Sequence, residues 1–324
     1  MSGENILVVY YAPTGYIEND IRILRKHYQV KAFSFRGIKD LPALVGEVKN
    51  SDIVISWFGA VHAGVATELA KLFRKKSIII EGGNDALVIK ELNYGFWISG
   101  RWHHKLIVKR ALKDADKLIA VSKFTKRELI KNTGITRDVD VVYIGVDPQF
   151  WKPKGEKENL ILTVANVRDW FRARIKGLDV FFKVAESLPE YKFEVVGVGN
   201  DFIKELERHK PRNVTISSFL EPEKLREKYQ KAKIYAQLSR IESFSVATVE
   251  AMLCGCIPVV TKVGALPEVV GDAGFYVPYG DITATVKAIK EAMHSELNPR
   301  NRGMYFSLDR RERELLRILK ELDS

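Results

Sequence analysis

The sequence predicts an α/β protein with two doubly wound parallel sheets in tandem, and three observations lead to this fold class. The chain of 324 residues is long enough for two domains of roughly 150 residues each. Short runs rich in Ile and Val alternate with longer amphipathic runs, as in parallel sheets covered by helices on both faces. Residues 145–159 break the alternation because they are rich in Pro, Gly and charge, so we interpret them as a linker.

The first half supplies strands and the helices between them. Residues 17–28 and 64–76 have the apolar spacing of helices. The apolar runs that we interpret as strands are residues 5–11, 30–35, 52–58, 77–82, 117–122 and 140–145.

The second half repeats this alternation. Residues 177–188 and 221–232 are predicted helices. The predicted strands are residues 160–167, 192–199, 214–220, 233–239, 257–262 and 274–279. Because ligands of such sheets bind beyond the carboxyl ends of the strands, polar residues at those ends are the candidates for a site.

Composition narrows the function classes. Hydrophobic content of 46% and charged content of 29% are typical of a soluble globular protein, and no apolar run approaches the roughly 20 residues that span a bilayer. The N-terminal residues are interpreted as a strand rather than a signal peptide. Both cysteines lie in "CGC", too close for a disulfide, so we expect buried thiols and a cytoplasmic protein. Abundant Lys, Arg and Glu with few Gln also fit a heat-adapted protein.

The net charge of +11 predicts anionic partners. Residues 101–131 carry ten Lys or Arg against three Asp or Glu, and Trp97 and Trp102 lie at the start of this region. Such a mixture is typical of a segment at a membrane surface, and equally of a basic helix in solvent. The first interpretation predicts a peripheral protein at the inner face of an anionic membrane. No nucleic-acid-binding signature appears, so nucleic acid is not an expected partner.

The clearest functional pattern is "SRIESFSVATVEAMLCGCIPVVTKVGALPE", Ser239 to Glu268. Glu242 lies in a polar loop after a predicted strand, and Glu250 lies about two turns into the helix that follows. The start of that helix, where Ser243 and Ser245 are candidate N-caps, can attract phosphate. A carboxylate such as Glu250 can accept two hydrogen bonds from a ribose diol. On spacing alone, an ordinary strand–helix unit with solvated glutamates is an equal alternative.

This stretch resembles the donor-site signature of retaining GT-B glycosyltransferases of the large glycogen-synthase and sucrose-synthase-like group, the family 4 type. The shared pattern is Glu, Phe, a second Glu in Glu-Ala-Met, and Gly-small-x-Pro-Glu; Ser245 stands where the family usually has Gly. The resemblance implies two Rossmann-like domains with a C-terminal helix that crosses back to the first. The donor-binding residues that it implies are Gly15, Arg168, Arg172, Lys176, Gly197, Glu242, Ser243, Phe244, Ser245, Val246 and Glu250.

Lys176 in "KGLDVFF" is similar to the family lysine that binds the donor diphosphate. The family arginine that precedes this lysine is absent, because Trp170 and Phe171 occupy its position. Arg168 or Arg172 is expected to replace it, and the sequence does not choose between them. A solvated basic loop is the alternative for this segment.

The first half carries fewer signals. Gly15 follows the first strand, as a glycine loop does in the family. His62 follows another strand and is interpreted either as a catalytic residue or as a structural histidine. "EGGNDAL" resembles the Gly-Gly-x-Asp segment of an archaeal and bacterial subgroup, which places Asn84 and Asp85 on the acceptor side.

The resemblance predicts an acceptor-side domain at residues 1–148, a donor-binding domain at 158–298, and a helix at 299–324 that packs on the first domain. The predicted reaction is retaining, metal-independent transfer of a hexosyl group from a nucleoside-diphosphate sugar to a carbohydrate or lipid-linked acceptor. Glu242, Lys176 and His62 are the predicted catalytic residues, and no cofactor is expected beside the donor substrate. The alternatives are an epimerase of the same fold and a non-catalytic sugar-nucleotide-binding partner subunit.

Overall fold

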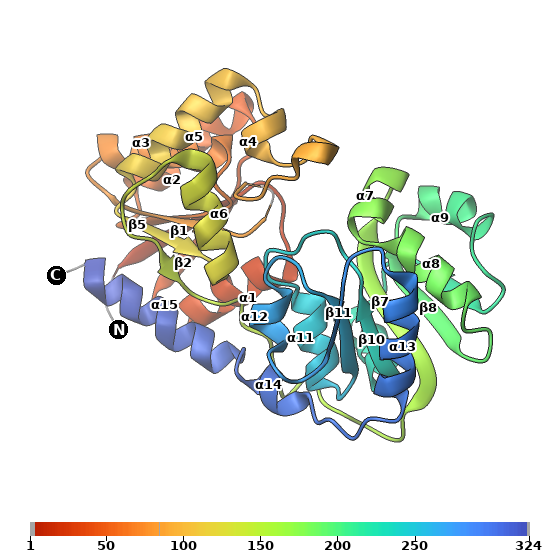
Figure 1. The fold of residues 1–324 in the computed structure, drawn as a ribbon. Helices are drawn as coiled ribbons and strands as arrows, with labels where there is room; N and C mark the ends of the chain where they lie inside the picture. The colour runs from red at the N-terminus through yellow and green to blue at the C-terminus, as the bar shows by residue number, and fades with distance from the viewer. Residues whose placement is uncertain (1–3, 84, 323–324) are drawn as a thin grey trace. The chain divides into compact units, whose positions relative to one another are not determined.

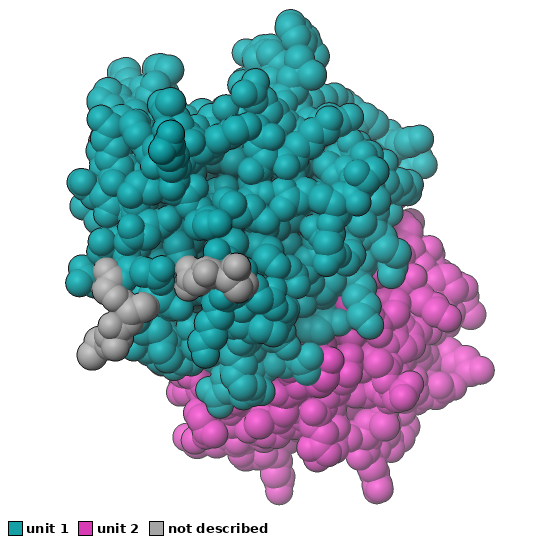
Figure 2. Space-filling model, turned by 90° about the vertical axis from the view of Figure 1, so that its left-hand side faces the viewer, with its two compact units in different colours: residues 1–145, 308–324 teal, residues 146–307 magenta. Residues whose placement is uncertain are grey.

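The computed structural model describes residues 4–83 and 85–322, and the chain divides into two compact units. Unit 1 comprises Met1–Gly145 and Leu308–Ser324, and unit 2 is Val146–Ser307; Figure 2 colours them separately. Within the described residues, each unit contains a six-stranded sheet in which all neighbouring strands are parallel. The predicted fold class is therefore confirmed.

Unit 1 has the strand order β2-β1-β3-β4-β5-β6. Its central strands are buried along almost their whole length, which explains why they appear in the sequence as continuous apolar runs. Its elements are β1 (Asn5–Tyr10), α1 (Gly15–Leu24), β2 (Gln29–Ser34), η1 (Ile38–Asp40), α2 (Leu41–Lys49), β3 (Ile53–Trp57), α3 (Val61–Leu72), β4 (Lys76–Glu81), η2 (Lys90–Leu92), α4 (Phe96–Ser99), α5 (Trp102–Asp114), β5 (Lys117–Ala120), α6 (Lys123–Thr133), β6 (Asp140–Val141) and α15 (Leu308–Leu322).

Unit 2 has the strand order β12-β11-β10-β7-β8-β9. Its core lies between the sheet and helices that include α8 and α13, which contact each other. Its elements are β7 (Glu158–Val167), α7 (Trp170–Ile175), α8 (Leu178–Glu186), β8 (Lys192–Val198), α9 (Asn200–Glu207), β9 (Val214–Ser217), α10 (Pro222–Lys231), β10 (Ala232–Gln237), α11 (Val246–Leu253), β11 (Ile257–Thr261), α12 (Leu266–Val270), β12 (Phe275–Val277), α13 (Ile282–Met293) and α14 (Arg300–Met304).

The predicted linker, residues 145–159, lies in unit 2 from Val146 onward and is packed against it. Trp151 is buried, with its ring centroid 5.5 Å from that of Tyr229. Lys157 Nζ donates hydrogen bonds of 2.8 Å to the carbonyl oxygens of Tyr229 and Cys254. The Pro, Gly and charged residues correctly predict that most of this segment lacks regular structure. They do not predict that Trp151 and Lys157 fasten it to unit 2.

The end of the chain contributes to both units. The segment predicted as one helical tail, residues 299–324, breaks between α14 in unit 2 and α15 in unit 1. Within unit 1, α15 packs against α1 (Figure 1). In the described part of the chain, no helix is both long and apolar enough to cross a membrane.

Candidate active-site residues

Lys176 and Glu242, which are distant in the sequence, form an ion pair in unit 2. Lys176 Nζ lies 2.7 Å from Glu242 Oε1, and the two side chains are 29% and 9% exposed. Lys176 ends α7 beyond β7, and Glu242 lies in the loop beyond β10, the strand next to β7 in the sheet. The structure thus brings two of the three predicted catalytic residues together at the carboxyl edge of the sheet.

The Glu242 carboxylate is held by further donors. Its Oε1 accepts a 2.8 Å hydrogen bond from Ser239 Oγ and a 3.1 Å hydrogen bond from Gln237 Nε2. Gln237 Oε1 in turn accepts a hydrogen bond from the Tyr235 hydroxyl at 2.5 Å. This network fixes the position of Glu242 before any ligand binds, which is the condition for effective electrostatic binding.

Two glycines allow the backbone segments of this site to approach each other. Gly177 has φ of +72°, and a Cβ there would collide with the carbonyl group of Leu238 at the end of β10. Gly264 has φ of +57°, and a Cβ there would collide with the backbone of Glu242. Glycine is therefore required at both positions, because it adopts positive φ without strain and has no side chain.

Ser245 is the N-cap residue of α11, but its side chain does not cap the helix. Its φ is +78°, a left-handed conformation that favours glycine, and its Oγ lies 2.7 Å from Thr248 Oγ1 instead. Ser243 is not the cap. Together with Val246, these residues lie at the start of an eight-residue helix, where they can approach a phosphate.

Glu250 lies on α11 with its carboxyl group turned toward Tyr229. Its Oε2 accepts a hydrogen bond from the Tyr229 hydroxyl at 3.1 Å. Burial raises the pKa of Glu250 to about 8, and the Tyr229 hydroxyl opposes part of this effect. Other atoms of the residue are partly exposed, so the side chain is neither a solvated glutamate nor a closed core residue.

The two candidate arginines make contacts of their own outside the Lys176–Glu242 pair. The Arg168 guanidinium lies over the Phe219 ring, 5.6 Å from its centroid, and Nε of the exposed Arg172 lies 3.9 Å from Asp169 Oδ2. The segment predicted as a loop is thus partly helical, with Asp169 accepting a hydrogen bond from the Arg172 amide as the N-cap. Neither contact singles out one arginine as the partner of Lys176.

Three other predicted donor-binding residues have structural roles. Gly197 has φ of +99°, and a Cβ there would lie 2.7 Å from the Ala165 carbonyl oxygen of the neighbouring strand. The Phe244 ring is buried against Phe306, with centroids 5.4 Å apart, so its contact with a donor stays a prediction. Gly15, in unit 1, opens α1 with open space around it.

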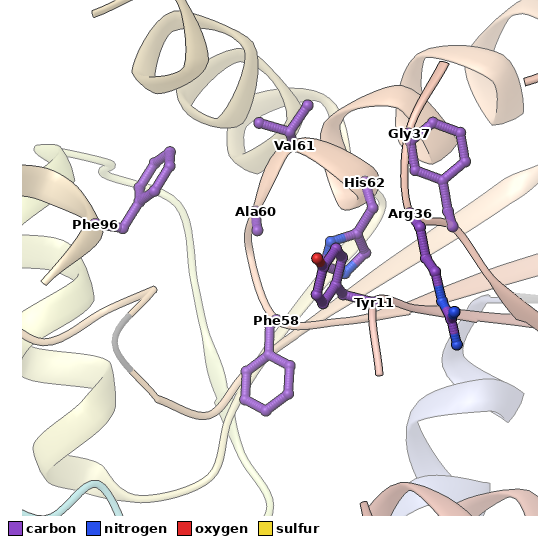
Figure 3. Close-up of a pocket in the computed structure, with 9 residues that line it drawn as sticks. Tyr11, Arg36, Gly37, Phe58, Ala60, Val61, His62 and Phe96 are labelled. Atoms are coloured by element: carbon purple, nitrogen blue, oxygen red, sulfur yellow. The ribbon is translucent and has the colours of Figure 1, made fainter. Parts of the chain in front are cut away.

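His62 lies in unit 1 and lines a cavity of about 380 Å³ (Figure 3). The cavity adjoins the carboxyl ends of β1, β2 and β3, and its other lining residues are Tyr11, Phe35, Arg36, Gly37, Phe58, Ala60, Val61 and Phe96. His62 is buried, and its Nε2 lies 2.7 Å from the Trp57 carbonyl oxygen. Burial lowers the pKa of His62.

Asp85 holds the backbone around this region. Its carboxylate is buried and accepts hydrogen bonds from the amides of Gly59, Gly82 and Gly83. These bonds occupy both carboxylate oxygens, so Asp85 supports the loop, and its contact with an acceptor stays a prediction. Asn84 lies outside the described residues.

Four polar residues near strand ends were not predicted as site residues from the sequence: Glu81, Gln237, Ser239 and Arg240. Glu81 is fully buried at the end of β4, and among the described residues its carboxyl oxygens have no hydrogen-bond partner. The Arg240 amide donates to the Ile175 carbonyl oxygen at 2.8 Å, and its Nε donates to the Tyr279 hydroxyl at 2.7 Å. The sequence feature that could have identified these residues is their position: each is a polar residue at or just beyond the end of an apolar strand.

Two family models match the chain. The model described as Glycosyltransferase Family 4 matches residues 5–150, and the model described as Glycosyl transferases group 1 matches residues 148–305. Their boundary lies close to the division between the first segment of unit 1 and unit 2.

Curated proteins and a solved structure give matches of the same kind. An uncharacterized glycosyltransferase of Methanocaldococcus jannaschii is 25% identical over 267 residues, which are 79% of this chain and 71% of that protein. A phosphatidylinositol N-acetylglucosaminyltransferase subunit of Arabidopsis thaliana is 28% identical over 211 residues, which are 62% of this chain. That match spans about half the length of the plant protein, 46%.

The solved structure is that of the Anabaena protein HepE in complex with UDP-glucose. It aligns with a TM-score of 0.81 and 16% identity over 98% of this chain and 100% of that one. At this identity the likeness concerns the fold. Because the two family models together match residues 5–305, the chain belongs to the family 4-type glycosyltransferases, which have the GT-B architecture.

Proposed function

We propose that this glycosyltransferase moves a hexosyl group from a nucleoside-diphosphate sugar to an acceptor hydroxyl, with retention of configuration and without a metal ion. The observation that carries the proposal is the pair of Lys176 and Glu242 at the carboxyl edge of the unit 2 sheet. A lysine at this edge can neutralise the diphosphate as it leaves, with support from the start of α11. Glu242 can hold sugar hydroxyls beside it.

The parts of the donor can be assigned to residues on and before α11. Glu250, further along α11, is the proposed partner of the ribose diol, and the loop from Ser243 to Val246 is the proposed neighbour of the phosphates. The HepE structure holds UDP-glucose, so uridine nucleotides are the first donors to test. A thermal-shift screen of UDP, GDP and ADP sugars identifies the base, because a bound ligand stabilises the folded protein by mass action.

The ion pair sharpens the mutational test. Glu250→Ala removes the proposed ribose partner, and above about pH 8, where the Glu250 carboxyl is charged, the loss of its hydrogen bond weakens UDP binding about 10- to 150-fold. Glu242→Ala leaves UDP affinity unchanged or tighter, because it releases Lys176 from its partner, while it depresses transfer. Lys176→Ala weakens UDP binding and lowers kcat further, since the diphosphate gains charge in the transition state.

Calorimetry with UDP and transfer rates with the full donor measure these effects, with exposed Lys183→Ala as the matched control. Equal losses of UDP affinity in Glu242→Ala and Glu250→Ala would contradict the assignment of separate roles. Unchanged binding and rates in all three variants would refute the site.

The alternative is a non-catalytic sugar-nucleotide-binding partner subunit. The Arabidopsis relative is named as a subunit, which favours keeping this candidate. Donor hydrolysis and transfer by the purified chain separate the two functions: a partner subunit binds the nucleotide and does neither.

A further inference from the structure

The unit 1 cavity combines apolar walls with one cation and with polar groups that include the His62 ring and the Tyr11 hydroxyl. In the view of Figure 3, the rings of Phe58 and Phe96 lie on one side of Tyr11 and His62, and Arg36 lies on the other. A volume of about 380 Å³ is at the lower end of the range of small-molecule sites, and the aromatic walls suit a ring or a short chain. The cavity thus suits a ligand with an apolar body.

Arg36 supplies the cation. It is exposed, and its Nε makes a long hydrogen bond of 3.4 Å to Ser34 Oγ, while its backbone amide donates to Asp40. Within the described residues, nothing hydrogen-bonds to its two terminal nitrogens. These nitrogens form the planar fork that binds carboxylate or phosphate with two parallel bonds.

His62 supplies the acceptor. A carbonyl oxygen only accepts, so the contact of Nε2 with the Trp57 carbonyl places the ring proton on Nε2. Burial keeps the ring neutral by lowering its pKa, so Nδ1 retains its lone pair. No described residue hydrogen-bonds to Nδ1. A hydroxyl group is the natural donor for this nitrogen.

The wall of the cavity is held in a strained conformation. Phe58 has φ of +69°, a left-handed conformation that strains a bulky residue, and such strain persists where the surroundings enforce it. Asp85 does so by binding the amide of Gly59, and Glu81 lies so close to Gly59 that a Cβ there would collide with its carboxyl group. The arrangement positions the Phe58 ring at the cavity.

We propose that this cavity binds the acceptor, and that the acceptor is an anionic alcohol with an apolar body. Arg36 binds the anionic group, the aromatic walls enclose the apolar part, and His62 Nδ1 accepts a hydrogen bond from the hydroxyl. This inference rests on the proposed function and specifies its acceptor. The chemistry is shared by a phosphorylated lipid headgroup and by a soluble phosphorylated alcohol.

Three related probes test it in the absence of donor: octyl glucoside 6-phosphate, octyl glucoside and glucose 6-phosphate. Calorimetry on the full chain is expected to show that the first binds at least about tenfold more tightly than the other two, because they lack the anion or the apolar body. Arg36→Ala should abolish the preference for the phosphate, and Arg36→Lys should restore part of it. Lys39→Ala is the matched control, because Lys39 is an exposed cation three residues further on, in η1, that does not line the cavity.

Vesicles that contain phosphatidylinositol distinguish the two sources. Binding to these vesicles that octyl glucoside 6-phosphate displaces supports a lipid acceptor, and probe binding without vesicle binding supports a soluble one. Equal affinity for all three probes overturns the proposal. It is also overturned if Lys39→Ala loses the preference for the phosphorylated probe as strongly as Arg36→Ala does. UDP affinity, measured in the same variants, should be unchanged, so failure of the donor site and failure of this cavity are distinguishable.

Discussion

A carboxyl group that is buried near a tyrosine hydroxyl makes the stability of unit 2 depend on pH. The pKa of Glu250 is raised to about 8, whereas glutamate in an unfolded chain titrates near about 4.3. Because the pKa is higher in the folded state, the neutral carboxyl group stabilises the folded protein. This contribution to the free energy of unfolding is fully present below about pH 4.3. That stabilisation is lost as the pH rises through 8.

We therefore predict that Glu250→Gln changes the pH dependence of unfolding. Between the two pKa values, about 4.3 and about 8, this group costs the wild-type protein about 1.4 kcal/mol of stability per pH unit. The glutamine side chain of the variant does not titrate, so the variant has no such loss. The melting temperature of the variant, relative to wild type, should rise steadily from pH 5 to pH 8. Exposed Glu291→Gln is the control and should give a constant difference; parallel curves for wild type and Glu250→Gln would contradict the prediction.

The start of α11 shows how one element constrains a residue type. Ser245 has φ of +78° and offers no cap to the helix, so the family preference for Gly at this position has a conformational cause. Serine retains its contact with Thr248 at 2.7 Å, which compensates part of the strain.

For this element we predict that Ser245→Gly is more stable than Ser245→Ala by about 1 kcal/mol. That reverses the usual order in helices, because alanine keeps the left-handed strain and loses the hydroxyl, whereas glycine relieves the strain. Denaturant unfolding of both variants measures the difference. At Ala251, in the middle of the same helix, glycine should instead be the less stable residue. An alanine variant of Ser245 as stable as the glycine variant would show that φ is not the constraint.

Helix α5 presents an apolar and basic surface. Trp102 and Leu106, four residues apart and therefore on one face, are 73% and 58% exposed, among cations such as Arg101 and Lys113. Trp97, in contrast, packs beside Phe96 against the unit 1 core. The two tryptophans that the sequence presents as equivalent thus differ, because Trp102 is exposed and Trp97 is packed.

We propose that this face binds an anionic lipid surface, since exposed Trp and Leu beside cations match the headgroup region. Flotation with anionic liposomes should show binding that weakens at high salt. The double substitution of Trp102 and Leu106 by Ala should reduce binding at least tenfold, because apolar burial and charge both contribute. Leu297→Ala, an exposed leucine in unit 2, should leave it unchanged. Binding by wild type and the double variant alike would exclude this face.

Patterns of apolar residues predict the elements well and their polar connections poorly. The strands of both sheets were predictable because a buried parallel strand is apolar along its length. The short α7 was not, because Asp169 caps it in a segment whose basic residues have no periodicity. Likewise, the pairing of Lys176 with Glu242 depends on which strands are neighbours in the sheet. The local sequence pattern does not predict that order.

At the scale of the whole molecule, unit 1 is built from both ends of the chain. Its last helix, α15, follows unit 2 in the sequence and is anchored by Arg311, which is 2% exposed. Arg311 donates to both carboxylate oxygens of Asp20 on α1, at 3.0 and 2.7 Å, and to the Val142 carbonyl oxygen at 2.6 Å. Asp20 also accepts a 3.1 Å hydrogen bond from Trp57 Nε1. The integrity of unit 1 thus depends on a helix that follows unit 2 in the sequence.

We predict that Arg311→Ala destabilises unit 1 by about 3–5 kcal/mol, because it leaves Asp20 buried without its partner. Asp20→Ala should cost a similar amount, and the double variant should cost less than the sum, since removal of both charges leaves neither one unpaired. Arg313→Ala, an exposed arginine on the same helix, is the matched control and should cost less than about 0.5 kcal/mol. Hydrogen exchange separates the units: faster exchange is expected in β1, β3 and α1, with β7 and β10 unchanged. Equal costs for Arg311→Ala and Arg313→Ala, or additive costs in the double variant, would show that the buried pair does not anchor the helix.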